Sequence, residues 1–385
     1  MFKPTMFSEI LKLLPAGIVD RAVRAHGADR WRKSFRTRDH LLAMLAAQFS
    51  SAGSLRQVET LIGAYAKRTY HLGGLRVRRS TLAQANATRT PAVFATIAAD
   101  LIAHAGRAGR PAKDLMAALD STSIRLAGRG HGWAEACRTR NGNQGLKLHL
   151  RIAAESAAAE WLKVTDMTVN DITAAREMPL EKGRIYLFDK GYCDYNWWME
   201  IIETGADFIT RLKRNAAFEI IGERDCDGET ILSDQVIRLA NKAPRGGKKN
   251  RLAARPLRLV RIPHPGGKKR PFLIVSSLLD AAAKDIAEGY RRRWSIELIF
   301  KWIKQNLKIK RFLGESRNAV AIQIYTAIIA YIPVRMYHRL FSNSKHRLLD
   351  VMTLLAANLF HPRPNPTPPK PPPDSSQPSL WEAAA

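Results

Sequence analysis

The fold is indicated most directly by residues 184–212, RIYLFDKGYCDYNWWMEIIETGADFITRL. The stretch opens with an apolar run that ends in an acid, Asp189. The segment YNWWMEIIETG is typical of a helix, and we expect it to end at Gly205, because glycine commonly terminates helices. The run DFITRL then predicts another strand. A strand, a helix and a strand in this order indicate an α/β unit with Asp189 at the end of its first strand.

The same pattern begins upstream of this stretch. The run LMAALD (115–120) also ends in an acid, Asp120. KLHLRI (147–152) and WLKVTD (161–166) alternate between apolar and polar residues, as half-buried strands do. The chain therefore predicts an α/β core with two carboxylates at the carboxyl ends of two strands.

Helical patterns lie on both sides of this core. Up to about residue 105, apolar residues recur at three- and four-residue spacing, and Ser54 is a typical cap for the helix LRQVETLIGAYA. We expect four parts: a helical N-terminal DNA-binding region (1–108), the core (109–340), a C-terminal helix (341–361) and a proline-rich, disordered tail (362–385).

The core contains a basic insertion that reads as short strands at about 215–279. Its second part, 235–279, has twelve Lys or Arg residues and no acid. Cations without acids suit a surface that neutralises phosphates. Those that we predict to bind DNA are Lys248, Lys249, Lys268 and Lys269.

The net charge indicates the class of partner. The 385 residues include 62 Lys or Arg and 34 Asp or Glu, a formal charge of +28, which favours nucleic acid over a membrane surface. Seven cations, with Trp31 and Phe35 among them, lie between Arg21 and Arg38. That segment suits DNA phosphates and a solvated basic face equally well; we assign Arg36 and Arg38 to DNA binding.

Cysteine usage and hydropathy indicate the compartment. Three widely spaced cysteines form neither a disulfide framework nor a zinc site. The N-terminus lacks the features of a secretory signal. The apolar run 319–334 is shorter than the roughly 18 residues of a bilayer span, which favours a buried helix. We expect a cytoplasmic protein without a membrane partner.

One helical face carries four residues of interest within YRRRWSIELIFKWIK. At about 100° per residue, they fall within an arc of about 60°. They are Tyr290, Arg293, Glu297 and Lys304. The alternative is an exposed face with ion pairs worth tenths of a kcal/mol each. Together with Asp120 and Asp189, however, Glu297 completes a set of three carboxylates, which are the ligands that Mg²⁺ prefers.

These residues resemble a known family. The spacing Tyr290-x2-Arg293-x3-Glu297-x6-Lys304 is similar to the YREK signature of bacterial insertion-sequence DDE transposases of the insertion sequence family four type, which move through a DNA hairpin. Asp120 in LDST and Asp189 in FDKGY occupy the places of the first two acids.

The resemblance implies a ribonuclease H-like catalytic core with a β-strand insertion between the second and third acids, which lie 108 positions apart. It implies that the three acids are catalytic and bind two Mg²⁺ ions, for which we expect Mn²⁺ to substitute. It further implies that the enzyme acts on terminal inverted repeats and target DNA as a homodimer, and that the other three signature residues contact phosphates at the transposon end.

Other residues near these motifs have simpler interpretations. We keep His149 out of the site, since a lone histidine in a strand is more often structural. We expect a helix to open at Asn170–Asp171, where a plain N-cap role is favoured over metal binding. Trp197 and Trp198 suit a helix core better than base stacking. Two rival functions stay open: a nuclease without strand transfer, and a non-catalytic DNA-binding remnant.

Overall fold

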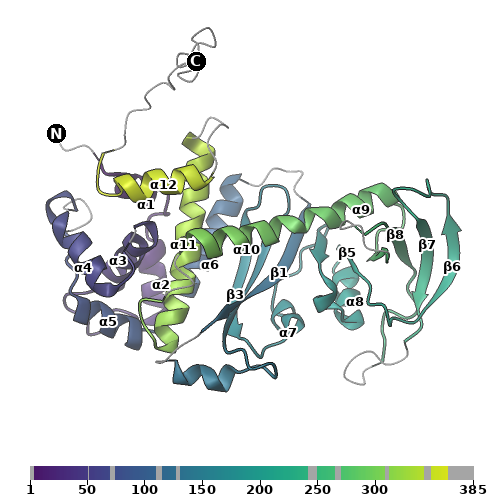
Figure 1. Ribbon diagram of the computed structural model, residues 1–385, viewed down its shortest axis with the longest axis horizontal. Helices are drawn as coiled ribbons and strands as arrows, with labels where there is room; N and C mark the ends of the chain where they lie inside the picture. The colour runs from purple at the N-terminus through teal and green to yellow at the C-terminus, as the bar shows by residue number, and fades with distance from the viewer. Residues whose placement is uncertain are drawn as a thin grey trace, which may run out of the picture.

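The computed structural model describes residues 4–50, 52–69, 74–109, 115–126, 131–241, 249–264, 270–307, 312–341 and 348–362. Helices from both ends of the chain gather at one end of an elongated molecule, and strands extend to the other end (Figure 1). Three of the four basic-cluster lysines, Lys248, Lys268 and Lys269, and the tail from residue 363 lie outside the described residues.

One mixed sheet forms the centre of the molecule. The described strands follow the order β3-β2-β1-β4-β5-β9-β8-β7-β6. Strands β1, β4 and β5 are parallel, and the other neighbouring strands are antiparallel. The bounds are β1 Met116–Arg125, β2 Gly145–Ala153, β3 Ala159–Asp166, β4 Ile185–Phe188, β5 Asp207–Arg211, β6 Phe218–Arg224, β7 Ser233–Leu239, β8 Leu257–Ile262 and β9 Phe272–Ser276.

The first acid lies within its strand and not at the strand's end, which corrects the sequence-based expectation. Pairing of β1 with β4 ends at Ala118, but pairing with β2 continues to Arg125. The apolar run stops at Asp120 because the strand there leaves the parallel part of the sheet, while its backbone remains bonded to β2. Asp189, in contrast, directly follows β4 as expected.

The expected basic strands are present, and they extend the core sheet. Strands β6 to β9 form an antiparallel series that joins the core through the pairing of β9 with β5. Two of the insertion's cations form ion pairs with acids that precede the acid-free stretch. Arg251 contacts Glu203 at 2.5 Å, and Arg258 is buried against Asp234.

Both faces of β1 and β4 are buried, in two different cores. Ala118 and Leu187 face the core on the side of α9 (Ala283–Arg292) and α10 (Trp294–Asn306), which lie end to end along the sheet (Figure 1). Leu119 and Phe188 face the core that α8 (Tyr195–Glu203) covers. Alternation along β1 therefore turns Asp120 toward the side of α9 and α10 and turns Ser121 away from it.

The tryptophans of α8 belong to the second core. Trp197 and Trp198 are at most 1% exposed and contact Phe188 and, for Trp198, also Phe208. This confirms the core interpretation and leaves no access for a base. Gly205, at φ +77°, follows α8 and its cap, Thr204, as predicted.

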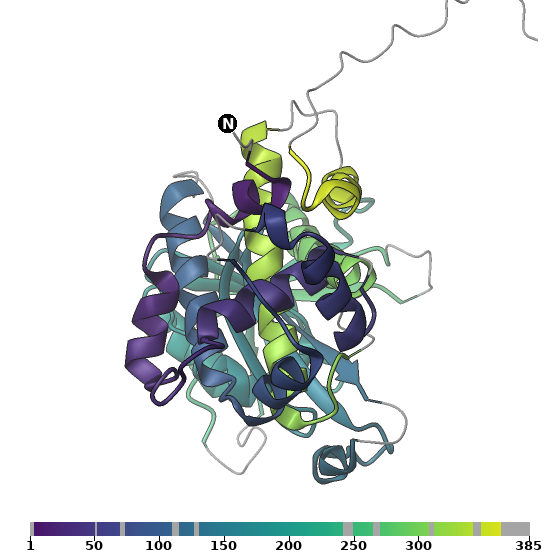
Figure 2. The same ribbon diagram turned by 90° about the vertical axis from the view of Figure 1, so that its left-hand side faces the viewer.

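The helical end is built around one long helix, α11 (Arg317–Phe341), which Figure 2 shows running through the N-terminal helices. It is the one described helix long and apolar enough to cross a membrane, and 83% of its most apolar window is buried within the protein. That burial confirms the predicted core helix, although the helix is longer than the apolar run in the sequence.

The remaining helices pack at this end or along the sheet. The cap of α4 is confirmed, because Ser54 Oγ accepts a hydrogen bond from the N–H of Gln57. A bridge between Thr5 and Pro362 brings both ends of the described chain together.

The division into domains stays a prediction. The bounds are α1 Met6–Leu11, α2 Ile18–His26, α3 Thr37–Phe49, α4 Leu55–Ala64, α5 Arg79–Thr88, α6 Ala92–Gly109, α7 Asp171–Ala175 and α12 Leu348–Asn358, with short 3-10 helices η1 Ala66–Arg68, η3 Gly132–Cys137 and η4 Lys190–Tyr192.

Candidate active site

Three acids from distant parts of the sequence line one cavity of about 760 Å³. Asp120 comes from the middle of β1, Asp189 follows β4, and Glu297 lies in the first turn of α10. Neighbouring strands place the two aspartates side by side, and α10 packs against β1, which brings Glu297 to them.

A tight turn holds the second acid. Asp189 Oδ1 accepts a hydrogen bond from the backbone N–H of Gly191 at 2.7 Å, which starts the short helix η4. A Cβ atom at position 191 would lie 2.7 Å from that same oxygen. The glycine in FDKGY is therefore required for the approach of this turn to the carboxylate.

The YREK segment contains a junction between two helices, where the sequence predicts one. Helix α9 ends before Arg293 and α10 begins after it, although Arg293 keeps a right-handed helical backbone. At the junction, the Arg293 N–H bonds to Tyr290 O and the Ile296 N–H bonds to Arg293 O, a tighter three-residue spacing. Tyr290, Arg293 and Glu297 nevertheless line the same cavity.

Lys304 does not line that cavity. It is half-buried on the last turn of α10, two turns beyond Glu297. The helix carries it along the axis by about 1.5 Å per residue, so sharing a face with Glu297 does not bring it to the same site.

Arg293 connects two of the acids. Its guanidinium lies 2.5 Å from Glu297 Oε1 and 3.6 Å from Asp120 Oδ2, and the arginine side chain is only 11% exposed. Burial raises the pKa of Asp120 to about 7, and the charges of Asp189 and Glu297 act in the same direction. Arg293 opposes this shift. Three acids and three arginines, the others being Arg211 and Arg291, line this cavity.

Cations and aromatic rings also line the cavity, and the sequence analysis did not identify two of them, Arg211 and Phe272. The guanidinium of Arg211 lies 3.8 Å from the ring centroid of Phe272. The Phe272 and Tyr290 rings pack edge to face, with their centroids 6.4 Å apart. Arg293 lies 5.6 Å from the Tyr290 ring. A cation ending the apolar run DFITR could have indicated Arg211, whereas Phe272 carries no signal of its own. His264 and the half-exposed Trp294 also line the cavity.

A polar cluster lies on the other face of β1. Asp171 Oδ1 accepts hydrogen bonds from Ser121 Oγ at 2.7 Å and from Lys147 Nζ at 3.0 Å. The predicted helix start is confirmed, because α7 begins at Asp171 with Asn170 in the cap position, although the Asn170 side chain makes no capping hydrogen bond. The buried His149 faces the same carboxylate from 3.8 Å, and burial lowers the pKa of that histidine to about 4.

The other predicted DNA-binding residues are distributed over the surface. Arg36 and Arg38 are exposed at the start of α3. Lys249 is exposed beside α8, where its carbonyl accepts a hydrogen bond from Asn196. None of the three lines the acid cavity.

The donor set suits a hard divalent cation. Carboxylate oxygens are the ligands that Mg²⁺ prefers, and it keeps several waters or phosphate oxygens beside them. Among the described residues, no three His, Cys, Asp or Glu side chains are grouped closely enough to hold one ion together as they stand. The convergence of three carboxylates on one cavity nevertheless fits a site in which pairs of acids share ions with a bound phosphate.

Comparison with known proteins identifies the family. Residues 111–332 match the family described as "Transposase DDE domain", and this range contains all three acids. The chain belongs to the DDE transposase family. It is an enzyme that acts on DNA, as are the transposases of bacterial insertion sequences. Residues 3–74 of this transposase match a domain of unknown function, DUF4372.

Relatives support the assignment. A protein of Sinorhizobium fredii named as a transposase, y4zB, is 39% identical to this transposase over 269 residues, which are 67% of this chain and 71% of the relative. A protein of Geobacillus stearothermophilus, named as the transposase for insertion sequence element IS5377, is 24% identical over 56% of this chain and 55% of its own length. Among solved structures, a piggyBac transposase synaptic complex with hairpin DNA aligns with 90% of this chain and 78% of that chain, at 10% identity and a TM-score of 0.47.

Proposed function

We propose that this transposase binds the terminal inverted repeats of a bacterial insertion sequence, excises the element through a hairpin intermediate and joins its 3′ ends to target DNA. It works in the cytoplasm, as a homodimer on the paired ends. The observation that carries the proposal is the convergence of Asp120, Asp189 and Glu297 on one cavity beside Arg293.

We assign the core to the ribonuclease H-like fold. Support comes from a mixed sheet whose adjacent parallel strands β1 and β4 carry the two aspartates, and from the packing of the Glu297 helix across β1. The strands β6 to β9 between the second and third acids supply the β-rich insertion.

In this proposal, the three acids hold two Mg²⁺ ions, which would activate the attacking oxygen and stabilise the leaving oxygen of each phosphoryl transfer. Arg293 and Tyr290 bind a phosphate at the transposon end, where Arg293 exchanges its carboxylate partners for phosphate oxygens. Such an exchange is favoured by geometry, since a guanidinium bonds carboxylate and phosphate with the same planar fork.

The test is strand cleavage of a labelled duplex that carries the DNA flanking the coding frame. We expect Asp120→Asn, Asp189→Asn and Glu297→Gln to lose cleavage in Mg²⁺ and in Mn²⁺ while still binding the duplex, because affinity comes mainly from Lys and Arg. Matched controls are Asp100→Asn and Glu200→Gln, which remove surface ion-pair partners outside the cavity.

The products separate the rival functions. Nicked, hairpin and double-cut species from the unaltered chain support the transposase mechanism. Nicks without hairpins indicate a nuclease, and binding without any cleavage indicates a DNA-binding remnant. Full cleavage by any one of the three acid variants removes that residue from the catalytic set.

A further inference from the structure

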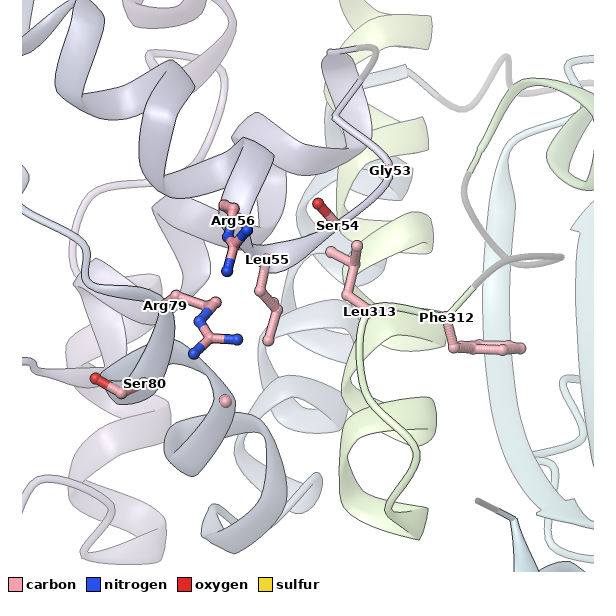
Figure 3. Close-up of a pocket in the computed structure, with 9 residues that line it drawn as sticks. Gly53, Ser54, Leu55, Arg56, Arg79, Ser80, Phe312 and Leu313 are labelled. Carbon is pink, nitrogen blue, oxygen red and sulfur yellow. The ribbon is translucent and has the colours of Figure 1, made fainter. Parts of the chain in front are cut away.

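A second cavity, of about 650 Å³, lies in the helical end of the molecule and shares no lining residue with the acid cavity. Figure 3 shows its wall, which is formed by the start of α4, the start of α5 and residues 312–313. The last of these belong to the segment between α10, which carries Glu297, and α11. The cavity therefore lies where the N-terminal helices meet the chain that leaves the catalytic helix.

Two arginines dominate this cavity. Figure 3 shows the guanidinium groups of Arg56 and Arg79 directed into the same opening. Both side chains are exposed, and neither has an acid or a hydrogen-bond partner among the residues that the structure describes. Some exposed arginines elsewhere do have such partners, as Arg176 does with Glu200. Two like charges that face one opening repel each other unless an anion lies between them.

The surrounding backbone favours an anion as well. Helix α5 begins at Arg79 and has no side-chain cap, which leaves the first N–H groups of a ten-residue helix for another acceptor. Ser80, at its second position, adds a hydroxyl to the cavity wall. By contrast, α4 is already capped by Ser54, so that helix offers the side chain of Arg56 instead.

This combination identifies the chemistry of the ligand. Planar guanidinium groups and helix N–H groups both match tetrahedral oxyanions, and phosphate is the common one that arginine binds with paired hydrogen bonds. The exposure of Arg56, Arg79 and Ser80 allows a polymer to reach the site from solvent. A formal charge of +28 favours the backbone of DNA as the source of that phosphate.

We propose that Arg56 and Arg79 clamp a DNA backbone phosphate in this cavity, outside the bond that is cleaved. The proposal rests on the proposed function, of which it specifies one DNA contact. The segment at 312–313 is fixed to α11 by a hydrogen bond from the Leu313 N–H to Gln323 Oε1 at 2.8 Å. A phosphate held here is thus tied to the same frame as the catalytic helix, which sets where the duplex enters the acid cavity.

The test uses the full chain and a labelled duplex carrying the DNA that flanks the coding frame. The variants are Arg56→Gln, Arg79→Gln and the pair, with Arg79→Lys to restore the charge. Arg24→Gln is the matched control, because Arg24 is an exposed arginine of α2 outside the cavity. Affinity is titrated against salt, and phosphate ethylation interference maps the contacted phosphates.

We expect the pair to flatten the log–log salt slope by roughly 0.9, the change for one lost phosphate contact, each single Gln variant to flatten it by less, and Arg79→Lys to restore most of the slope. One ethylation signal should vanish in the pair and persist in Arg24→Gln.

Two results would overturn the clamp: a slope for the pair no flatter than that of Arg24→Gln, or an unchanged ethylation pattern. The proposed function fails separately, if the unaltered chain does not cleave the duplex in Mg²⁺. Equal melting temperatures for all variants exclude unfolding as the cause of any difference.

Discussion

At the residue scale, one face of β1 lines the acid cavity and the other face binds Asp171. Asp120 faces the cavity, and its neighbour Ser121 faces the opposite side, where it donates a hydrogen bond to Asp171. The side chain of Lys147 is only 13% exposed and bonds the same carboxylate. Asp171 therefore anchors the strand that presents Asp120, the first of the proposed catalytic acids, and does not itself line the cavity.

We predict that Asp171→Asn slows cleavage about tenfold and raises the Mg²⁺ concentration needed for half-maximal rate, because small displacements of a reacting group are costly. Loss of a half-buried ionic partner should also lower the unfolding free energy by about 1–3 kcal/mol. Single-turnover nicking over a Mg²⁺ series and urea unfolding measure both effects. Asp166→Asn, which removes the partner of Arg317, is the control. An unchanged Mg²⁺ midpoint would leave Asp171 a purely structural role.

His40 gives the helical end a dependence on pH. Burial lowers the pKa of His40 from 6.5 to about 3, with Arg89 and Arg32 acting in the same direction and the hydrogen bond to Asn86 opposing it. The folded protein thus keeps His40 neutral where the unfolded chain protonates it. Its contribution to stability is complete above about pH 6.5 and is lost as the pH falls toward 3.

We predict that His40→Gln reduces the unfolding free energy at pH 7 but weakens its decline between pH 6.5 and 4.5, by up to about 1.4 kcal/mol per pH unit. Urea unfolding at several pH values measures the decline. His149 has a lowered pKa as well and is unchanged in the variant, so it cancels in the comparison. Parallel declines for both proteins would mean that His40 does not set the acid sensitivity.

At the element scale, the junction of α9 and α10 sets which YREK residues meet the acids. The tight turn around Arg293 places its guanidinium between Asp120 and Glu297, whereas Lys304 stays on the far turn of α10. The four signature residues are therefore not equivalent.

We predict that Arg293→Gln lowers the rate of hairpin formation by about 100-fold and affects the first nick less, because the second attack requires the nicked end to be held against the opposite strand. Lys304→Gln should have the smaller effect on chemistry, and Tyr290→Phe isolates the share of the hydroxyl. A gel that resolves nicked, hairpin and double-cut products measures each step. Normal product ratios in Arg293→Gln would leave Glu297 as the only catalytic residue of this helix pair.

At the scale of the whole molecule, charge is distributed over both ends of the fold. The helical end presents Arg36, Arg38 and the cavity of Arg56 and Arg79, and the insertion presents Lys249. The acid cavity is lined by residues of β1, β5, β8, β9, α9 and α10. These elements lie between the helical end and the outermost insertion strands (Figure 1). A duplex that contacts both ends would cross the cavity.

We predict that changing Lys248, Lys249, Lys268 and Lys269 together to Ala flattens the salt slope of duplex binding by roughly 0.9 for each lost contact. The control is Arg251→Gln in the same stretch, since Arg251 already has Glu203 as its partner and should leave the slope almost unchanged. Equal salt slopes for the unaltered chain and the lysine variant would mean that these lysines are solvated and do not contact DNA phosphates.

The sequence by itself determined the parts of this protein that depend on local pattern. The α/β order, a core helix over 319–334 and the Ser54 cap follow from periodicity and capping chemistry, and the choice of the three acids follows from motif spacing. Periodicity and capping can be recognised in the sequence because they depend on residues only a few positions apart.

Only the tertiary structure decided which residues share a site. The pairing of β9 with β5 brings Phe272 beside Arg211, and the packing of α7 brings Asp171 to Ser121, across 61 and 50 positions of sequence respectively. The position of Lys304 outside the cavity also depends on how α10 packs against β1. Strand pairing and helix packing are set by contacts between distant residues, for which local periodicity carries no signal.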